Sequence, residues 1–259
     1  MLSHALKREN YMKVTFIAGV EGSGTTLLQR LLSLPNVCSS LGGMYFKLPS
    51  HPEAEILSRE FAGCSRRLWD RKASLADHEK ARQDILTATN ALLSSVAFAD
   101  QSHLIFKRSF PFGQPHGQYV PDIWDMLDLG FEARVIVVYR DPCAATYSAL
   151  RRGFDADIRR LAVMCGEQLT WLAGQVRAID PNIVRIASYR RLCQQPHAIL
   201  AELAEFCGIP WNDGILDMHM EKIDEEADKR YSAELKKSEA DWLESFFDAR
   251  RRKQWENLV

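Results

Sequence analysis

The chain has 259 residues and 46% of them are hydrophobic, which is enough apolar material for the core of one large α/β domain. Its 33 Lys and Arg residues nearly balance its 34 Asp and Glu residues, which argues against nucleic acid as a partner. No apolar run has the length of a membrane span, and the six cysteines lack any spacing typical of a metal site. We therefore expect a cytoplasmic protein with reduced thiols, no membrane span and no metal.

A strand, a glycine-rich turn and a helix are predicted in succession near the N-terminus. Residues 14–18 form an apolar, β-branched run, and leucines at helical spacing begin at Leu27. The turn between them reads Gly-Val-Glu-Gly-Ser-Gly over residues 19–24. Glycines let such a turn wrap closely around a ligand, and the following helix directs its free N–H groups at whatever the turn holds. The pattern predicts a phosphate-binding loop.

This loop has the spacing of a nucleotide-binding loop but lacks its lysine. Gly19 and Gly24 are separated as in the pattern G-x-x-x-x-G-K-[ST], yet Thr25 stands at the lysine position and Thr26 at the hydroxyl position. A kinase normally needs that lysine on its phosphates. Thr25 therefore argues against a nucleotide-dependent kinase, which we keep as an alternative.

The rest of the chain alternates strands with helices. Strands are predicted over residues 103–106, 134–139 and 183–187, and helices over residues 27–32, 53–72, 77–100, 120–129, 142–151, 157–179, 196–207 and 238–253. Residues 38–52 are rich in Ser, Gly and Pro and are predicted to form a loop. Such alternation implies a parallel sheet with helices on both faces. We expect a single P-loop-type α/β domain over residues 1–259, with a flexible N-terminus at 1–12 and no signal peptide.

The strongest strand signal, residues 134–139, leads into a second cluster of polar residues. Asp141 is a predicted N-cap, and Pro142 takes the first position of the next helix. Ser148 lies eight positions after Arg140, on that helix. The guanidinium and the hydroxyl can converge on one doubly charged group. The alternative is that Arg140 pairs locally with Asp141 and that Ser148 is merely exposed.

The two clusters together resemble the sulfotransferase family. Residues 23–26, S-G-T-T, are similar to the loop that in this family holds the 5′-phosphosulfate of 3′-phosphoadenosine 5′-phosphosulfate (PAPS). Arg140 and Ser148 are similar to the motif that grips its 3′-phosphate. Residues 188–192, S-Y-R-R-L, resemble the Y-E-D-L segment with Arg190 in place of the acid.

The resemblance extends from Val14 to about Phe247, with a weaker match of residues 229–242 to the family's C-terminal basic segment. It implies a sulfotransferase that moves a sulfuryl group from PAPS to a hydroxyl or amine without a metal. The acceptor would be a small molecule or a glycan, held by a helical insertion at residues 38–100. The cofactor-binding residues that it implies are Gly22, Ser23, Gly24, Thr25, Thr26, Arg140, Ser148 and Tyr189.

The catalytic residues are harder to assign because the chain departs from the family pattern. The family loop has Lys or Arg where this chain has Gly22, so we expect Lys107 to supply the cation near the bridging oxygen. Glu21, His51 and His116 are candidates for the general base, although each is also typical of a surface or structural position. Gly22 keeps open a further hypothesis, a sulfotransferase-like domain that binds a nucleotide without turnover.

Overall fold

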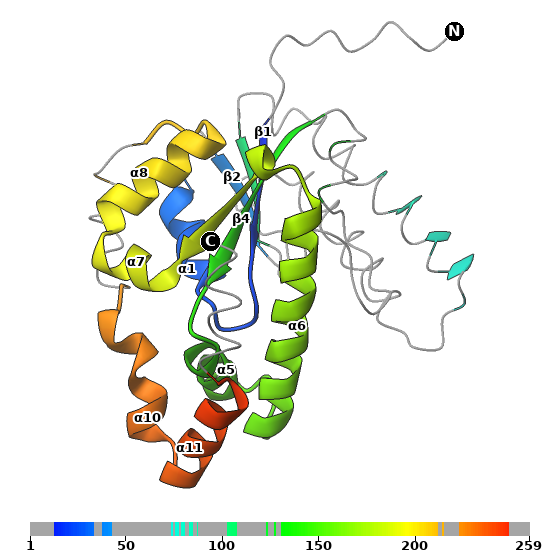
Figure 1. The fold of residues 1–259 in the computed structure, drawn as a ribbon. Helices are drawn as coiled ribbons and strands as arrows, with labels where there is room; N and C mark the ends of the chain where they lie inside the picture. The colour runs from blue at the N-terminus through cyan, green and yellow to red at the C-terminus, as the bar shows by residue number, and fades with distance from the viewer. Residues whose placement is uncertain are drawn as a thin grey trace, which may run out of the picture.

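The centre of the protein is a parallel sheet of five strands in the order β2-β3-β1-β4-β5 (Figure 1). The computed structural model describes residues 13–33, 38–42, 103–107, 131–211 and 223–248, with single residues between 74 and 87 and at 123, 127 and 214. The strands are β1 (Lys13–Ala18), β2 (Cys38–Gly42), β3 (His103–Lys107), β4 (Glu132–Tyr139) and β5 (Val184–Ser188). All neighbouring pairs are parallel, which confirms the predicted α/β fold.

Helices cover both faces of the sheet, as the sequence predicts. The described helices are α1 (Thr25–Leu32), α5 (Pro142–Arg151), α6 (Ile158–Ala178), α7 (Tyr189–Gln194), α8 (Pro196–Cys207), α10 (Arg230–Glu234) and α11 (Lys237–Phe246). Short 3-10 turns are η2 (Pro181–Ile183) and η4 (Glu225–Asp228). Figure 1 shows α6 along one face of the sheet and α1, α7 and α8 on the other. The helices α5, α10 and α11 gather at the end where β1 and β4 finish.

Alternating residues of the central strands β1 and β4 belong to two separate hydrophobic cores. Phe16 and Val135 face α5, α6 and α11, whereas Ile17 and Ile136 face α1, α7 and α8. Successive side chains of a strand point to opposite faces, so a strand covered on both sides must be apolar throughout. This explains the continuous apolar runs of β1 and β4, the two strands with the clearest sequence signals.

The strand β2 corrects the prediction of a loop over residues 38–52. Its backbone pairs with β3 from Cys38 opposite His103 to Gly42 opposite Lys107. β2 lies at the edge of the sheet, where pairing with one neighbour through backbone hydrogen bonds tolerates residues of low strand propensity such as Ser and Gly. The composition of this segment therefore predicted a loop where the chain forms a strand.

Helix boundaries agree with the sequence where caps are present. Asp141 accepts hydrogen bonds from the N–H groups of Cys143 and Ala144 at the start of α5, as its N-cap prediction requires. The last helix was predicted to reach residue 253, but α11 ends at Phe246 because Phe247 leaves the helical conformation and is fully buried. The predictions for residues 1–12 and 53–72, and most of those for 77–100 and 120–129, fall outside the described residues.

His103 gives the fold a pH dependence. Its side chain is buried at the start of β3, and this burial, reinforced by the charge of Lys13, lowers its pKa. Backbone hydrogen bonds with Gly208 and Cys207 and the charge of Glu132 oppose the shift without cancelling it. Stability from the neutral imidazole is therefore complete above the unfolded-state pKa of about 6.5 and is lost as the pH falls through the range below it.

We expect the free energy of unfolding of the wild type to fall more steeply between about pH 7 and pH 5 than that of His103→Gln, by at most about 1.4 kcal/mol per pH unit. The measurement is urea unfolding across this pH range. The matched control is His197→Gln, at an exposed position of α8, which should keep the wild-type pH dependence. Parallel curves for the wild type and His103→Gln would contradict the prediction.

Candidate functional site

The glycine-rich loop joins the end of β1 to the start of α1. Its backbone has positive φ at Gly22 (85°) and at Gly24 (98°), a conformation that side-chain-bearing residues rarely adopt. Gly24 is the N-cap of α1 and has no side chain to satisfy the first N–H groups of that helix. The order of strands reverses at β1, which is where ligands bind in open parallel sheets. Within the described residues, the loop is therefore followed by a helix N-terminus that no side chain caps.

Ser23 marks the interior of this loop. Its side chain is fully buried, and its Oγ has no hydrogen-bond partner within the described part of the chain. A Cβ added to Gly19 would lie 2.5 Å from this Oγ, so the hydroxyl lies directly across the loop from Gly19. A buried hydroxyl without a partner is costly. The oxygen of a bound anion would satisfy it, so the loop fits a phosphate.

Lys107 reaches the loop from the neighbouring strand. It is the last residue of β3, and its Nζ donates a hydrogen bond to Oγ1 of Thr26 at 3.0 Å. Burial lowers the pKa of Lys107, the charge of Glu21 opposes that shift, and Arg152 and Arg30 reinforce it. The structure thus brings together the predicted cation, the loop threonine and the loop carboxylate.

Gly22 has no room for a side chain. A Cβ built there would lie 2.2 Å from the carbonyl oxygen of Ala145 and 3.1 Å from Cβ of Ser148, both on α5. The loop therefore packs directly against this helix. The lysine or arginine of the resembled family loop cannot be placed at residue 22 without moving either the loop or α5.

Arg140 is buried behind the loop and has three partners. Its Nη1 donates to the carbonyl oxygen of Gly22 at 2.8 Å, and its Nε donates to Oδ1 of Asp228 at 2.7 Å. Its guanidinium carbon lies 4.3 Å from the ring centroid of Tyr189. Asp141 instead caps α5, so Asp228 is the carboxylate that pairs with Arg140.

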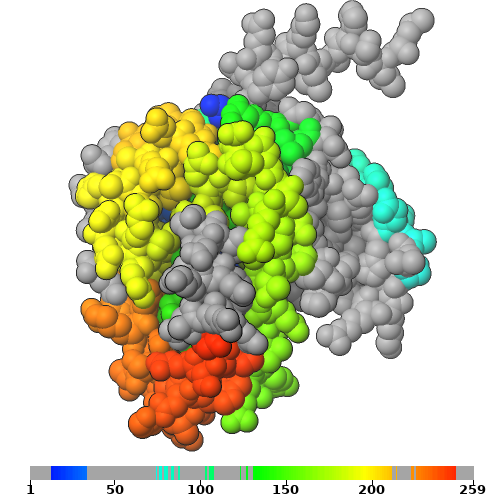
Figure 2. All heavy atoms as spheres, in the orientation of Figure 1, coloured from blue at the N-terminus to red at the C-terminus, as the bar shows by residue number. Residues whose placement is uncertain are grey.

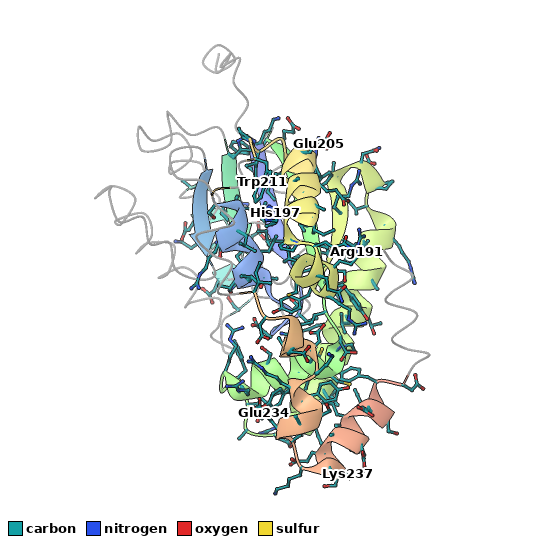
Figure 3. The ribbon with its side chains drawn as sticks, turned by 90° about the vertical axis from the view of Figure 1, so that its left-hand side faces the viewer. Arg191, His197, Glu205, Trp211, Glu234 and Lys237 are labelled. Carbon is teal, nitrogen blue, oxygen red and sulfur yellow. The ribbon has the colours of Figure 1, made fainter. Side chains whose placement is uncertain are left out.

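Tyr189 forms a wall of the loop. A Cβ on Gly24 would lie 2.4 Å from Cδ2 of Tyr189, so the ring packs against that glycine while Arg140 lies over it. Burial raises the pKa of Tyr189 far above the usual value, which keeps the phenol neutral. Figure 3 shows its helix α7, marked by Arg191, between α8 and α10.

The remaining predicted residues divide into those that lie at the loop and those that the structure leaves undescribed. Thr25 and Thr26 begin α1, and Ser148 lies on α5 beside Gly22. Two base candidates, His51 and His116, lie outside the described residues, as does most of the predicted insertion at 38–100. Asp228 was missed by sequence reasoning, although it directly precedes the basic residues that mark the C-terminal match.

The described residues contain neither a metal-binding cluster nor a membrane-spanning helix. No group of three or more His, Cys, Asp or Glu residues in this part of the chain is arranged to hold a metal ion. Among the described helices, none combines the length and the apolar character that a membrane crossing needs.

The fold is that of an α/β protein with a glycine-rich loop between its first strand and its first helix. The chain belongs to the sulfotransferase family, whose model matches residues 15–213. The sulfotransferase domain of the Synechococcus PCC 7002 olefin synthase has a similar fold, with a TM-score of 0.57 and 19% identity, over 93% of this chain and 96% of that domain.

Two curated relatives match this chain over only part of their own length. The chain is 24% identical over 216 residues to an uncharacterized protein of Aquifex aeolicus (strain VF5) and 26% identical over 230 residues to protein-tyrosine sulfotransferase 1 of Danio rerio. The matches cover 80% and 82% of this chain but only 27% and 57% of those proteins. The chain therefore spans part of the length of each.

The tight packing at Gly22 is testable by adding one methyl group. We expect Gly22→Ala to lower the free energy of unfolding by about 1–3 kcal/mol more than Gly153→Ala, because only the first methyl group meets backbone atoms. Gly153 also has positive φ (73°) but nothing within 4 Å of the added Cβ, so it controls for backbone strain alone. If both variants lose the same free energy of unfolding in chemical denaturation, α5 moves away from residue 22 without an energetic cost.

Proposed function

We propose that the protein is a PAPS-dependent sulfotransferase that acts on a hydroxyl or amine of a small-molecule or glycan acceptor. The observation that carries this proposal is the hydrogen bond from Lys107 Nζ to Thr26 Oγ1. It brings a cation to Thr26 in a loop of the family type whose usual cation is replaced by Gly22. Family membership supports the same reaction class.

PAPS, when bound, supplies the activated sulfuryl group, and the chain's own residues orient it and stabilise charge. The backbone N–H groups of residues 22–26 and the hydroxyls of Ser23, Thr25 and Thr26 would hold its 5′-phosphate. Lys107 would neutralise the negative charge that develops on the departing phosphate oxygen. Its lowered pKa reflects a site from which water is partly excluded, where such a charge has a larger effect.

Removal of the acceptor proton requires a base near the sulfuryl group. Glu21 is supported by its position in the loop and by its electrostatic effect on Lys107. His116 stays a prediction from the sequence, as does an acceptor site built from residues 38–100. The assignment of the 3′-phosphate to Arg140 and Ser148 is supported by the contacts of both residues with Gly22. The role of Tyr189 in cofactor binding is supported by its packing against Gly24 and Arg140.

A non-catalytic nucleotide-binding domain is a second candidate. The observation that favours it is the burial of Arg140 against Asp228, which leaves the proposed 3′-phosphate site with an internal carboxylate. A nucleotide-dependent kinase is the third candidate, and the threonine at residue 25 argues against it.

Ligand preference separates these candidates. We expect wild-type protein to bind 3′-phosphoadenosine 5′-phosphate (PAP) more tightly than ATP or adenosine 5′-phosphate in calorimetric titrations. Arg140→Ala should weaken PAP by one to three decades, roughly the value of charge-assisted hydrogen bonds to a phosphate, and should scarcely change adenosine 5′-phosphate. Ser148→Ala should cause a smaller loss of the same selectivity, because a neutral hydroxyl makes a weaker bond.

Thermal unfolding of each variant controls for the loss of the buried ion pair. A preference for ATP would contradict the sulfotransferase assignment. Equal weakening of PAP and adenosine 5′-phosphate by Arg140→Ala would show that Arg140 is structural.

Replacing Lys107 tests whether its charge acts on the rate of turnover or on the affinity for the cofactor. We expect Lys107→Ala to lower the rate of PAPS cleavage by roughly two to three decades while changing PAP affinity much less, because the cation acts on charge formed in the transition state. PAPS hydrolysis, with water as the acceptor, measures this without knowledge of the natural acceptor. Lys107→Arg keeps the charge and should retain part of the rate, and Lys237→Ala, at an exposed position of α11, should be silent. An unchanged rate in Lys107→Ala would show that another residue stabilises the charge on the departing phosphate oxygen.

A further inference from the structure

An internal carboxylate already contacts the cation on which the proposed 3′-phosphate site depends. The side chains of Arg140 and Asp228 are only 6% and 10% exposed, and Nε and Oδ1 are 2.7 Å apart. We propose that Asp228 competes with the 3′-phosphate of the cofactor for Arg140, and thereby sets how strongly the protein distinguishes 3′-phosphorylated nucleotides from others. This inference rests on the proposed function.

Asp228 lies between two arginines from different elements. Its Oδ1 accepts from Arg140, at the end of β4, and its Oδ2 lies 3.9 Å from Nε of Arg190, near the start of α7. Arg190 is 65% exposed, so its charge is largely screened by water. The buried contact with Arg140 is therefore the one that matters for a ligand.

The charges of the neighbouring basic residues are also neutralised by nearby carboxylates. Lys229 pairs with Glu226 at 2.9 Å, and Arg230 pairs with Asp224, all within residues 224–230. These are the basic residues that resemble the family's C-terminal segment. Each therefore has an acid of the same segment beside it, as Arg140 has Asp228, so the region is neutralised from within.

Electrostatics makes joint occupation of the site unfavourable. A carboxylate at hydrogen-bond distance cancels most of the guanidinium charge, and a phosphate monoester carries a charge between about −1.5 and −2 at neutral pH. Two anions that share one buried cation repel each other, and each loses hydration. The 3′-phosphate can therefore bind Arg140 fully only when Asp228 withdraws, and this requirement weakens binding of PAP but not of adenosine 5′-phosphate.

The C-terminal segment does not depend on Asp228 for its attachment. Helix α11 is anchored by Leu243 and Phe247, which are fully buried against the core that contains α5 and α6. Figure 2 shows α10 and α11, in orange and red, at the lower end of the molecule below α7. Removing the charge of Asp228 should therefore leave this segment folded and change only what Arg140 meets.

The test is Asp228→Asn, which keeps the shape of the side chain and removes its charge. We expect this variant to bind PAP about tenfold more tightly than the wild type, within the usual range of coupling between sites, and to change adenosine 5′-phosphate less than about twofold. Without ligand it should unfold at a lower temperature, since Arg140 loses its ionic partner. A merely structural residue would lower both stability and affinity, so the opposite signs identify competition.

Two further variants complete the design. Asp224→Asn removes a carboxylate of the same segment that pairs with Arg230, and should leave PAP affinity near that of the wild type. Asp228→Ser, smaller and uncharged, repeats the main measurement if the asparagine does not fold, with the same expected gain.

The outcomes separate this inference from the proposed function. If the wild type binds PAP and Asp228→Asn binds it equally or more weakly, Asp228 is not a competitor and the proposed function stands. If the variant gains affinity for PAP and adenosine 5′-phosphate alike, the effect is not directed at the 3′-phosphate and the inference is wrong. If neither protein binds PAP, the proposed function is overturned and the inference with it.

Discussion

One buried guanidinium holds the candidate site together. Arg140 joins the loop carbonyl of Gly22, the ring of Tyr189 and the carboxylate of Asp228, which come from three separate parts of the chain. Removal of one partner of a buried ion pair typically costs about 3–5 kcal/mol, because the other charge is left without compensation. The packing of the glycine loop against α7 therefore depends on this residue, whereas Leu243 and Phe247 anchor the C-terminal segment separately.

The same packing excludes a cationic side chain at residue 22. Because the Gly22 backbone is pressed between α5 and Arg140, no side chain fits at that point of the loop. Lys107 is the last residue of β3, which pairs with β1, and its Nζ reaches Oγ1 of Thr26. The packing of Gly22 thus excludes a cation at residue 22, and Lys107 brings one to the same loop from β3.

Local signals in the sequence predicted those parts of the fold and site that depend on neighbouring residues. The strand, loop and helix around residues 14–32 and the capped start of α5 were correct because glycine, proline and N-cap chemistry act over a few positions. The edge strand β2 was missed because its pairing to β3 owes little to its own side-chain types. Asp228 was missed because it lies 88 residues from Arg140 and only the fold brings them together.

Arg190, which departs from the family pattern, and Asp228 can be described together as an exchange of charge between α7 and η4. The resembled Y-E-D-L segment has an acid where this chain has Arg190, and here Asp228 lies between Arg190 and Arg140. In this chain the negative charge near Arg140 comes from η4, and the start of α7 carries the positive charge of Arg190. An acid on α7 would be fixed beside Tyr189, whose ring is packed against the loop, whereas η4 precedes a helix that is anchored independently. The packing of Tyr189 against Gly24 does not involve Asp228, so withdrawal of this carboxylate from Arg140, as proposed above, would leave that contact in place.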